Sequence, residues 1–202
     1  VVVGGGIHGL SSAIALAKEG LKVSLLEKRS GLMEATSRAT QNRAHLGYHY
    51  PRSPDTAVEC IKGLEFFRKK YSSSLFLIGE DYYLIDRKDS KTSFDEFENF
   101  CKTVGLPYEI SSHHSALWYK DKIEGAFKVE EPVYNPEMLK RLMEQEASEL
   151  GVEIKTGSKV IGLEEPNGKK RIISYERNCV GYETEIIVNS TYAYSNNVLK
   201  AL

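Results

Sequence analysis

The sequence predicts an α/β fold: a Rossmann-like domain built from both ends of the chain, with an inserted α+β portion. Three observations predict it. A β-branched run at residues 1–3 leads through glycines into a segment whose apolar residues recur at helical spacing. A second strand, residues 21–26, follows that helix, so that strand, helix and strand alternate as in a parallel sheet. The alternation returns where a helix beginning near residue 136 leads into a strand at 152–154.

The glycines between the first strand and the first helix fit the spacing G-x-G-x-x-G at Gly4, Gly6 and Gly9. In this motif the first glycine permits a tight turn, the second lets a pyrophosphate approach the backbone, and the third lets helix and strand pack closely. The free N–H groups and the dipole of a helix N-terminus favour an anion at the same place. The stretch therefore predicts a pyrophosphate site; a purely structural glycine turn is the alternative.

An acidic residue follows the second strand at the distance that a dinucleotide site requires. Glu27 lies 18 residues after Gly9, close to the ~20 expected for the carboxylate that accepts hydrogen bonds from an adenosine ribose. Because strand, glycines, helix, strand and acid occur in order, we favour a dinucleotide site over a structural turn. NAD and FAD share the adenosine diphosphate half that this motif binds, so the glycines do not distinguish them.

The segment that follows, residues 27–53, is polar and aperiodic. A connection longer than ~12–15 residues without its own periodicity is usually functional or disordered. This segment is rich in hydroxyl, amide and imidazole groups, namely those of Thr36, Ser37, Thr40, Gln41, Asn42, His45 and His49. Such a loop suits a long polar cofactor such as FAD, whereas a nicotinamide-binding Rossmann half would soon enter another helix and strand. A solvated loop is the alternative interpretation.

Local signals predict the elements of the middle part. Ser53 and Pro54 indicate the start of a helix whose apolar face extends to about residue 71. Residues 75–78 and 82–85 are expected to form strands about a turn at 79–81. A helix over residues 94–104 should begin with a capping box of Ser93 and Glu96 and end at Gly105.

Towards the C-terminus, Pro136 opens a further helix that Gly151 ends, and the strand at 152–154 follows. The dipeptide Asn167-Gly168 predicts a hairpin between strands at 160–163 and 171–173. A last strand is expected at residues 185–188.

Composition and charge exclude several classes of protein. Of the 202 residues 41% are hydrophobic and 27% charged, which predicts a folded globular protein rather than a disordered one. Lys and Arg (27) balance Asp and Glu (28) without clustering, so we expect no nucleic-acid partner. The three cysteines have no disulfide or metal-binding spacing, and we find neither a signal peptide nor a long apolar run. These features predict a cytoplasmic protein without an integral membrane segment and without a metal site; His113 and His114 are expected in a loop.

The segment TSRATQNRAHLGYHY, residues 36–50, resembles FAD-dependent oxidoreductases of the D-amino acid oxidase superfamily. It is most similar to the glycerol-3-phosphate dehydrogenase and L-2-hydroxyglutarate dehydrogenase branches. The resemblance rests on the Thr-Ser-Arg run and on the pattern His-x-Gly-x-x-Tyr at His45, Gly47 and Tyr50, and it continues over residues 134–164 and 185–196. Because such enzymes are usually much longer, we expect an N-terminal portion of a longer enzyme.

The motif and the resemblance together imply FAD as the cofactor and assign residues to its site. The expected cofactor-binding residues are Gly4, Gly6, Gly9, Glu27, Lys28, Ser37, Thr40, His45 and Val160. We expect residues 1–74 and 134–202 to form the FAD-binding domain and residues 75–133 to form part of a substrate-binding domain.

The resemblance also implies a reaction. The expected enzyme oxidises a C–H bond bearing a hydroxyl or amine in a small, often carboxylate-containing substrate, by hydride transfer to flavin. His45 is the candidate catalytic base because it matches the family's histidine and titrates near neutrality; a neutral histidine beside the cofactor is the alternative. His49, Tyr50 and Arg52 are candidates to meet an anionic substrate, or else surface and packing residues. An NAD-dependent Rossmann enzyme and a non-catalytic dinucleotide-binding module remain the competing functions, and the oligomeric state is left open.

Overall fold

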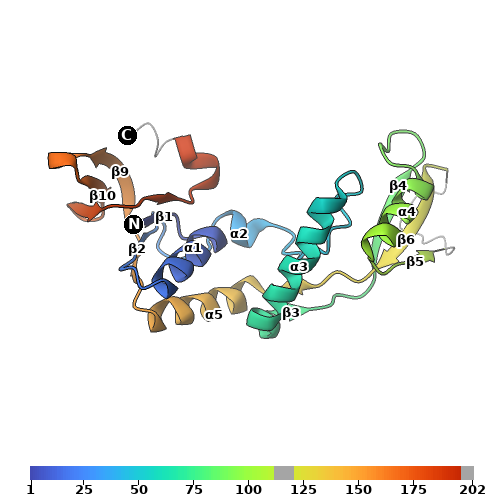
Figure 1. The fold of residues 1–202 in the computed structure, drawn as a ribbon, viewed down its shortest axis with the longest axis horizontal. Coiled ribbons are helices and arrows are strands. Elements are labelled where there is room, and N and C mark those ends of the chain that lie inside the picture. Colours follow the sequence, from blue (N-terminus) through green and yellow to red (C-terminus); the bar gives the residue numbers. More distant parts are fainter. Residues whose placement is uncertain (112–120, 197–202) are drawn as a thin grey trace. The chain divides into compact units, whose positions relative to one another are not determined.

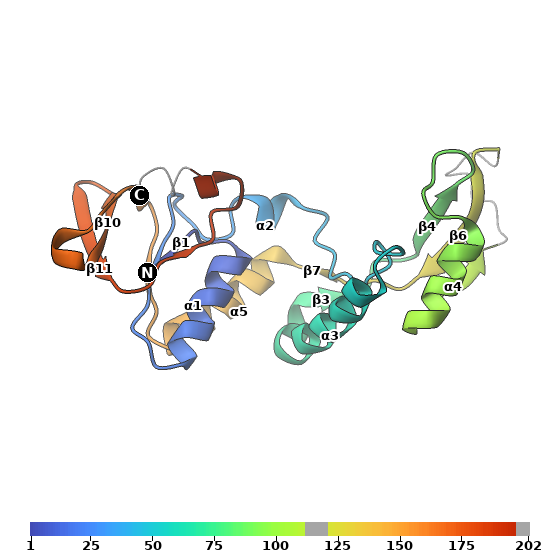
Figure 2. The same ribbon diagram turned by 45° about the horizontal axis from the view of Figure 1, so that its top comes forward.

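The computed structural model describes residues 1–111 and 121–196. The chain divides into two compact units: Val1–Thr40 together with Pro136–Leu202, and Gln41–Asn135. Figures 1 and 2 show the elements of both. The predicted α/β class with a parallel sheet is confirmed. Residues 41–74 belong to the second compact unit. The sequence analysis assigns them to the FAD-binding domain, and their contribution to FAD binding stays a prediction. His113 and His114 lie outside the described residues.

A parallel sheet of order β12-β1-β2-β8 organises the first unit. Its strands are β1 (Val2–Val3), β2 (Ser24–Leu26), β8 (Glu153–Lys155) and β12 (Val188–Asn189). Helix α1 (Ile7–Lys18) joins β1 to β2, and α5 (Pro136–Glu149) leads into β8. The two helices pack together (Figure 1) and share an ion pair between Lys18 and Glu146 at 2.7 Å. Strands β1 and β2 and helices α1 and α5 bury apolar side chains, among them Val2, Leu10, Leu25, Leu139 and Met143.

A second, antiparallel sheet of the first unit consists of β9 (Lys159–Glu164), β10 (Lys170–Tyr175) and β11 (Cys179–Thr184). The predicted hairpin at Asn167-Gly168 is confirmed: both residues have positive φ, 55° and 75°, as tight hairpin turns require. The last strand, predicted at residues 185–188, begins later, at Val188. Val188 pairs with Val2, the first residue of its partner strand β1.

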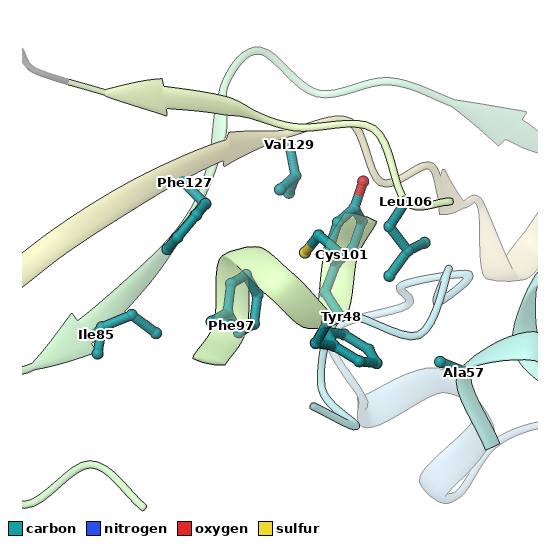
Figure 3. Packing of buried hydrophobic residues seen from close by; sticks show 9 residues of the cluster. Tyr48, Ala57, Ile85, Phe97, Cys101, Leu106, Phe127 and Val129 are labelled. Atoms are coloured by element: carbon teal, nitrogen blue, oxygen red, sulfur yellow. The ribbon is translucent and has the colours of Figure 1, made fainter. Parts of the chain in front are cut away.

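The second unit combines the long helix α3 (Pro54–Tyr71) with an antiparallel sheet of order β4-β6-β5 and helix α4 (Phe94–Val104). The sheet strands are β4 (Asp81–Asp86), β5 (Glu109–Ser111) and β6 (Ile123–Val129). The predicted capping box of α4 is confirmed: Ser93 Oγ accepts a hydrogen bond from Glu96 N, and Ser93 N donates to Glu96 Oε2. Figure 3 shows the core of this unit, where Tyr48, Phe97 and Phe127 pack among aliphatic neighbours.

The expected arrangement of two neighbouring strands about residues 79–81 is wrong. Strand β3 (Leu75–Phe76) pairs with β7 (Val133–Tyr134), and β4 pairs with β6. The reason is burial: β4 places Ile85 in the aromatic core against Phe127 of β6, whereas Leu77 and Ile78 before the turn stay exposed. Alternation and turn residues predict strands, but the partner of a strand is decided by the surface that it covers.

Candidate functional site

The turn between β1 and α1 holds strand and helix at close range. Gly4 has φ 104°, and a Cβ there would lie 2.7 Å from the carbonyl oxygen of Ser190. A Cβ on Gly9 would overlap the carbonyl oxygen of Gly4. Any side chain at either position would therefore push backbone apart, so both glycines are required by the packing of the turn itself.

Gly6 differs from these two glycines. It is the N-cap of α1 with φ −78° and ψ −177°, which other residues also adopt, and a Cβ there would meet only Ser37 Oγ, at 3.1 Å. The first turn of α1 contains no acidic residue, and the first N–H groups of a helix have no partner inside the helix. Ser37 Oγ accepts a hydrogen bond from Ile7 N at 3.1 Å. The start of α1 thus combines a glycine whose Cβ position meets a single flexible side chain with N–H donors suited to an anion.

Glu27 lies directly after β2 and faces the same turn. Its Oε2 accepts a hydrogen bond from Gly5 N at 2.6 Å, and its Oε1 accepts one from Arg29 N at 2.8 Å. Because an ionised carboxylate has about four lone-pair positions, two further hydrogen bonds can be accepted. The two backbone donors fix the carboxylate beside the glycine turn, where a ribose carrying the phosphates would need it.

The remaining predicted cofactor residues are distributed over both units. Lys28 lies in the first unit, its Nζ 3.6 Å from the centre of the Tyr194 ring. Thr40 follows the short helix α2 (Thr36–Ala39) as its C-cap. Val160, in β9, packs against the buried cluster of Val3, Leu26 and Ile172. His45 belongs to the second unit.

His45 lies beside a buried carboxylate that the sequence analysis missed. Glu131 is 0% exposed, and its Oε2 lies 3.6 Å from His45 Nδ1. The same carboxylate accepts hydrogen bonds from Leu46 N at 2.8 Å, from Tyr83 OH at 2.9 Å and from Arg43 Nη1 at 3.4 Å. One charge and two further donors thus stabilise an anion that has no access to solvent.

These contacts decide the charge state of the group. Burial works to raise the pKa of Glu131, but His45, the Leu46 N–H and Tyr83 outweigh it and hold this pKa below its ordinary value. Burial, with Glu131 as the second cause, raises the pKa of Tyr83, so the phenol stays protonated and donates. The site therefore holds an ionised acid next to an imidazole.

The other candidates to contact an anionic substrate are His49, Tyr50 and Arg52, and they differ in their contacts with His45. The His49 ring makes edge contacts with the rings of His45 and Tyr83, at centroid distances of 4.6 and 5.1 Å. Burial, followed by the charge of His45, lowers the pKa of His49. His49, Tyr50 and Arg52 are all exposed. Of these three, His49 is the one whose ring contacts His45 among the described residues.

Sequence reasoning missed Glu131, Arg43 and Tyr83 because they come from three separate segments. The local sequence gives no clear signal for Glu131, because it follows Glu130, which is exposed, and only the structure shows which of the two acids is buried.

No helix in the described part of the chain is long and apolar enough to span a membrane.

Comparison with known proteins identifies the family of this chain. Residues 1–202 match the family described as FAD dependent oxidoreductase (DAO). The anaerobic glycerol-3-phosphate dehydrogenase subunit A1 of Haloferax volcanii is 29% identical over 165 residues, which are 79% of this chain and 28% of that protein. The FAD-dependent monooxygenase kojA of Aspergillus flavus is 34% identical over 107 residues, 50% of this chain and 24% of that protein.

The fold is shared with L-alpha-glycerophosphate oxidase from Mycoplasma pneumoniae, solved with FAD bound, at a TM-score of 0.72 and 18% identity. That match covers 92% of this chain and 52% of the oxidase. The chain thus spans about half of this solved structure and less than a third of the two curated relatives. Since the family match extends over residues 1–202, the chain belongs to the FAD dependent oxidoreductases of the DAO family.

Proposed function

We propose that this protein oxidises a C–H bond bearing a hydroxyl or amine in a small, carboxylate-containing substrate, with FAD as the electron acceptor. The observation that carries the proposal is the start of α1, where Gly6, which has no side chain, lies beside backbone N–H donors and the fixed carboxylate of Glu27. Anion donors and a ribose acceptor are what the adenosine diphosphate half of FAD needs, so the residues fit the cofactor. A cytoplasmic location belongs to the same proposal.

Within this proposal, each residue of the first unit has one task. The N–H groups at the start of α1 bind the pyrophosphate, and Glu27 accepts the ribose hydroxyls. Ser37, Thr40 and Lys28 are positioned in or near the polar segment that would line the cofactor. Val160 contributes backbone on β9.

When bound, FAD supplies an acceptor for the hydride that leaves the substrate carbon. The chain itself must remove the proton from the substrate hydroxyl or amine, and we assign this task to His45. Its imidazole lies beside the ionised Glu131, which favours the protonated form that proton transfer generates. The oxidised product is then a carbonyl or an imine.

The cofactor is tested on the full-length protein by its visible absorbance before and after acid precipitation, with the released compound identified by mass. FAD in the supernatant supports the proposal, and flavin retained in the pellet would add covalent attachment. A colourless protein that does not bind added FAD but is stabilised by NAD would overturn it in favour of an NAD-dependent enzyme.

The reaction is tested by screening hydroxy acids, amino acids and glycerol phosphates for reduction of the bound flavin under anaerobic conditions. With a substrate in hand, His45→Asn should lower kcat, expressed per bound FAD, by ~10²-fold or more, because general base catalysis contributes about 10²–10⁴. An unchanged kcat would refute His45 as the base. Incorporation of an oxygen atom into the product would instead indicate a monooxygenase.

A further inference from the structure

Several hydrogen-bond donors of the second unit hold the carboxylate of Glu131 in place. This carboxylate is fully buried and receives three donors from two segments: Arg43 and Leu46 N from one, and Tyr83 OH of β4 from the other. Arg43 is itself held by Asp81, whose Oδ1 lies 2.8 Å from Nη2. The carboxylate therefore cannot turn away from its position, and one side of Oε2 faces His45.

The Nδ1 atom of His45 is a buried polar atom, and such atoms normally have a hydrogen-bond partner. It is buried and has no hydrogen-bond partner within the described part of the chain. Glu131 Oε2, at 3.6 Å, is the carboxylate oxygen that it faces. This separation is slightly longer than a hydrogen bond, and catalytic hydrogen bonds are often long until a substrate is bound. A buried imidazole nitrogen facing an ionised carboxylate is stabilised when it carries the proton.

We propose that Glu131 is a positioning residue that accepts a hydrogen bond from Nδ1–H of His45 and so leaves Nε2 as the proton-accepting atom. The step is one proton transfer: the substrate hydroxyl or amine loses its proton to Nε2, and the resulting imidazolium is stabilised by the Glu131 charge. The catalytic part of this inference rests on the proposed function, whereas the choice of tautomer does not.

The same three residues, His45, His49 and Glu131, also offer ligand atoms within 4.8 Å of one another. A cation between them is disfavoured, because Arg43 Nη1 already lies 3.4 Å from the carboxylate oxygen that faces His45. A neutral Nδ1–H in the same place adds a donor without adding a second positive charge. Among the described residues, Glu131 and His49 contact His45. Arg43 and Tyr83 bind Glu131, and Asp81 binds Arg43.

The test is ¹⁵N NMR of histidine-labelled full-length protein, which reports the tautomer of each imidazole. His45→Asn identifies the His45 signals. We expect the Nδ1–H tautomer of His45 at neutral pH, and a smaller population of this tautomer in Glu131→Gln, because the charged acceptor that faces Nδ1 is lost. Glu130→Gln is the matched control: it removes the neighbouring acid, which is exposed, and should leave the His45 tautomer unchanged.

An Nε2–H tautomer of His45 in the unsubstituted protein would overturn the inference. This measurement does not depend on whether Glu131→Gln folds. Equal tautomer populations of His45 in Glu131→Gln and Glu130→Gln would overturn it as well, and so would stoichiometric metal that is lost on substitution of His49. If the tautomer is as expected but His45→Asn retains kcat, the proposed base is wrong and the placement of Glu131 still holds.

Discussion

Substitution of Gly6 by valine should abolish FAD binding while the protein remains folded. The backbone of Gly6 is extended, with φ −78° and ψ −177°, so a β-branched residue is not strained there. Among the described residues, the atom near a Cβ at Gly6 is Ser37 Oγ at 3.1 Å, about 0.4 Å short of the ~3.5 Å at which non-bonded atoms attract best. A rotation of the Ser37 side chain relieves this contact. The hydrogen bond that Ser37 Oγ accepts from Ile7 N is then at risk, and such a bond is worth about 0.5–1.5 kcal/mol.

Gly4 provides the contrast. Its Cβ would lie 2.7 Å from a backbone oxygen of Ser190, about 0.8 Å short of the same ~3.5 Å. Its φ of 104° adds strain for any side chain. Positive-φ strain of about 1–2 kcal/mol and overpacking of about 1–3 kcal/mol predict a loss of about 2–5 kcal/mol for Gly4→Ala. The valine at Gly6 should therefore cost less stability than the smaller alanine at Gly4.

The assay pairs urea unfolding without cofactor with FAD titration, each on Gly6→Val, Gly4→Ala and the control Gly162→Ala. Gly162 lies in β9 of the same unit, and its Cβ would only touch Ile173 at an ordinary 3.8 Å. We expect Gly6→Val to weaken FAD binding at least tenfold, about 1.4 kcal/mol, and Gly162→Ala to leave it unchanged. A folded Gly6→Val protein that binds FAD with unchanged affinity would refute the pyrophosphate placement. Unfolding of Gly6→Val to the extent of Gly4→Ala would refute the steric reasoning.

Three further predictions concern stability and are checked by chemical unfolding. Ser93→Ala should cost about 1 kcal/mol, because it removes the N-cap acceptor of α4, and Ser93→Thr should restore most of it; equal losses in both would contradict the capping role. Gly63→Ala, on the exposed face of α3, should stabilise the fold by about 0.5–1 kcal/mol, because a Cβ there meets none of the described residues within 4 Å. Gly105→Ala should destabilise the fold, because Gly105 has φ 76°. The reverse order would refute the backbone argument. The pKa of Glu131 is held below its ordinary 4.5, so this group stabilises the fold above pH 4.5, and that stability is lost as the pH falls through the folded-state pKa. Glu131→Gln should therefore flatten the loss of unfolding free energy below pH 4.5, and an unchanged slope would count against an ionised, buried Glu131.

Much of the first unit could be predicted from local sequence alone. The order of strand, glycines, helix, strand and acid follows from residues that are close along the chain, and short-range signals suffice for it: apolar periodicity for α1, Pro136 for the start of α5, and Asn167-Gly168 for the hairpin. The family resemblance depended on the same kind of local pattern. The capping box of α4 was predictable for the same reason, since Ser93 and Glu96 act on each other within one helical turn.

What only the tertiary structure decided is which distant residues meet. The partner of β4 lies about forty residues further along the chain, and no turn signal specifies it, because pairing follows the burial of Ile85 and Phe127 in one core. The distinction between Gly6 and Gly4 likewise depends on the backbone of Ser190, far along the chain. Glu131 beside His45 is the clearest case: a buried charge is tolerable only where Leu46, Tyr83 and Arg43 supply donors, and those donors converge only when three separate segments fold together.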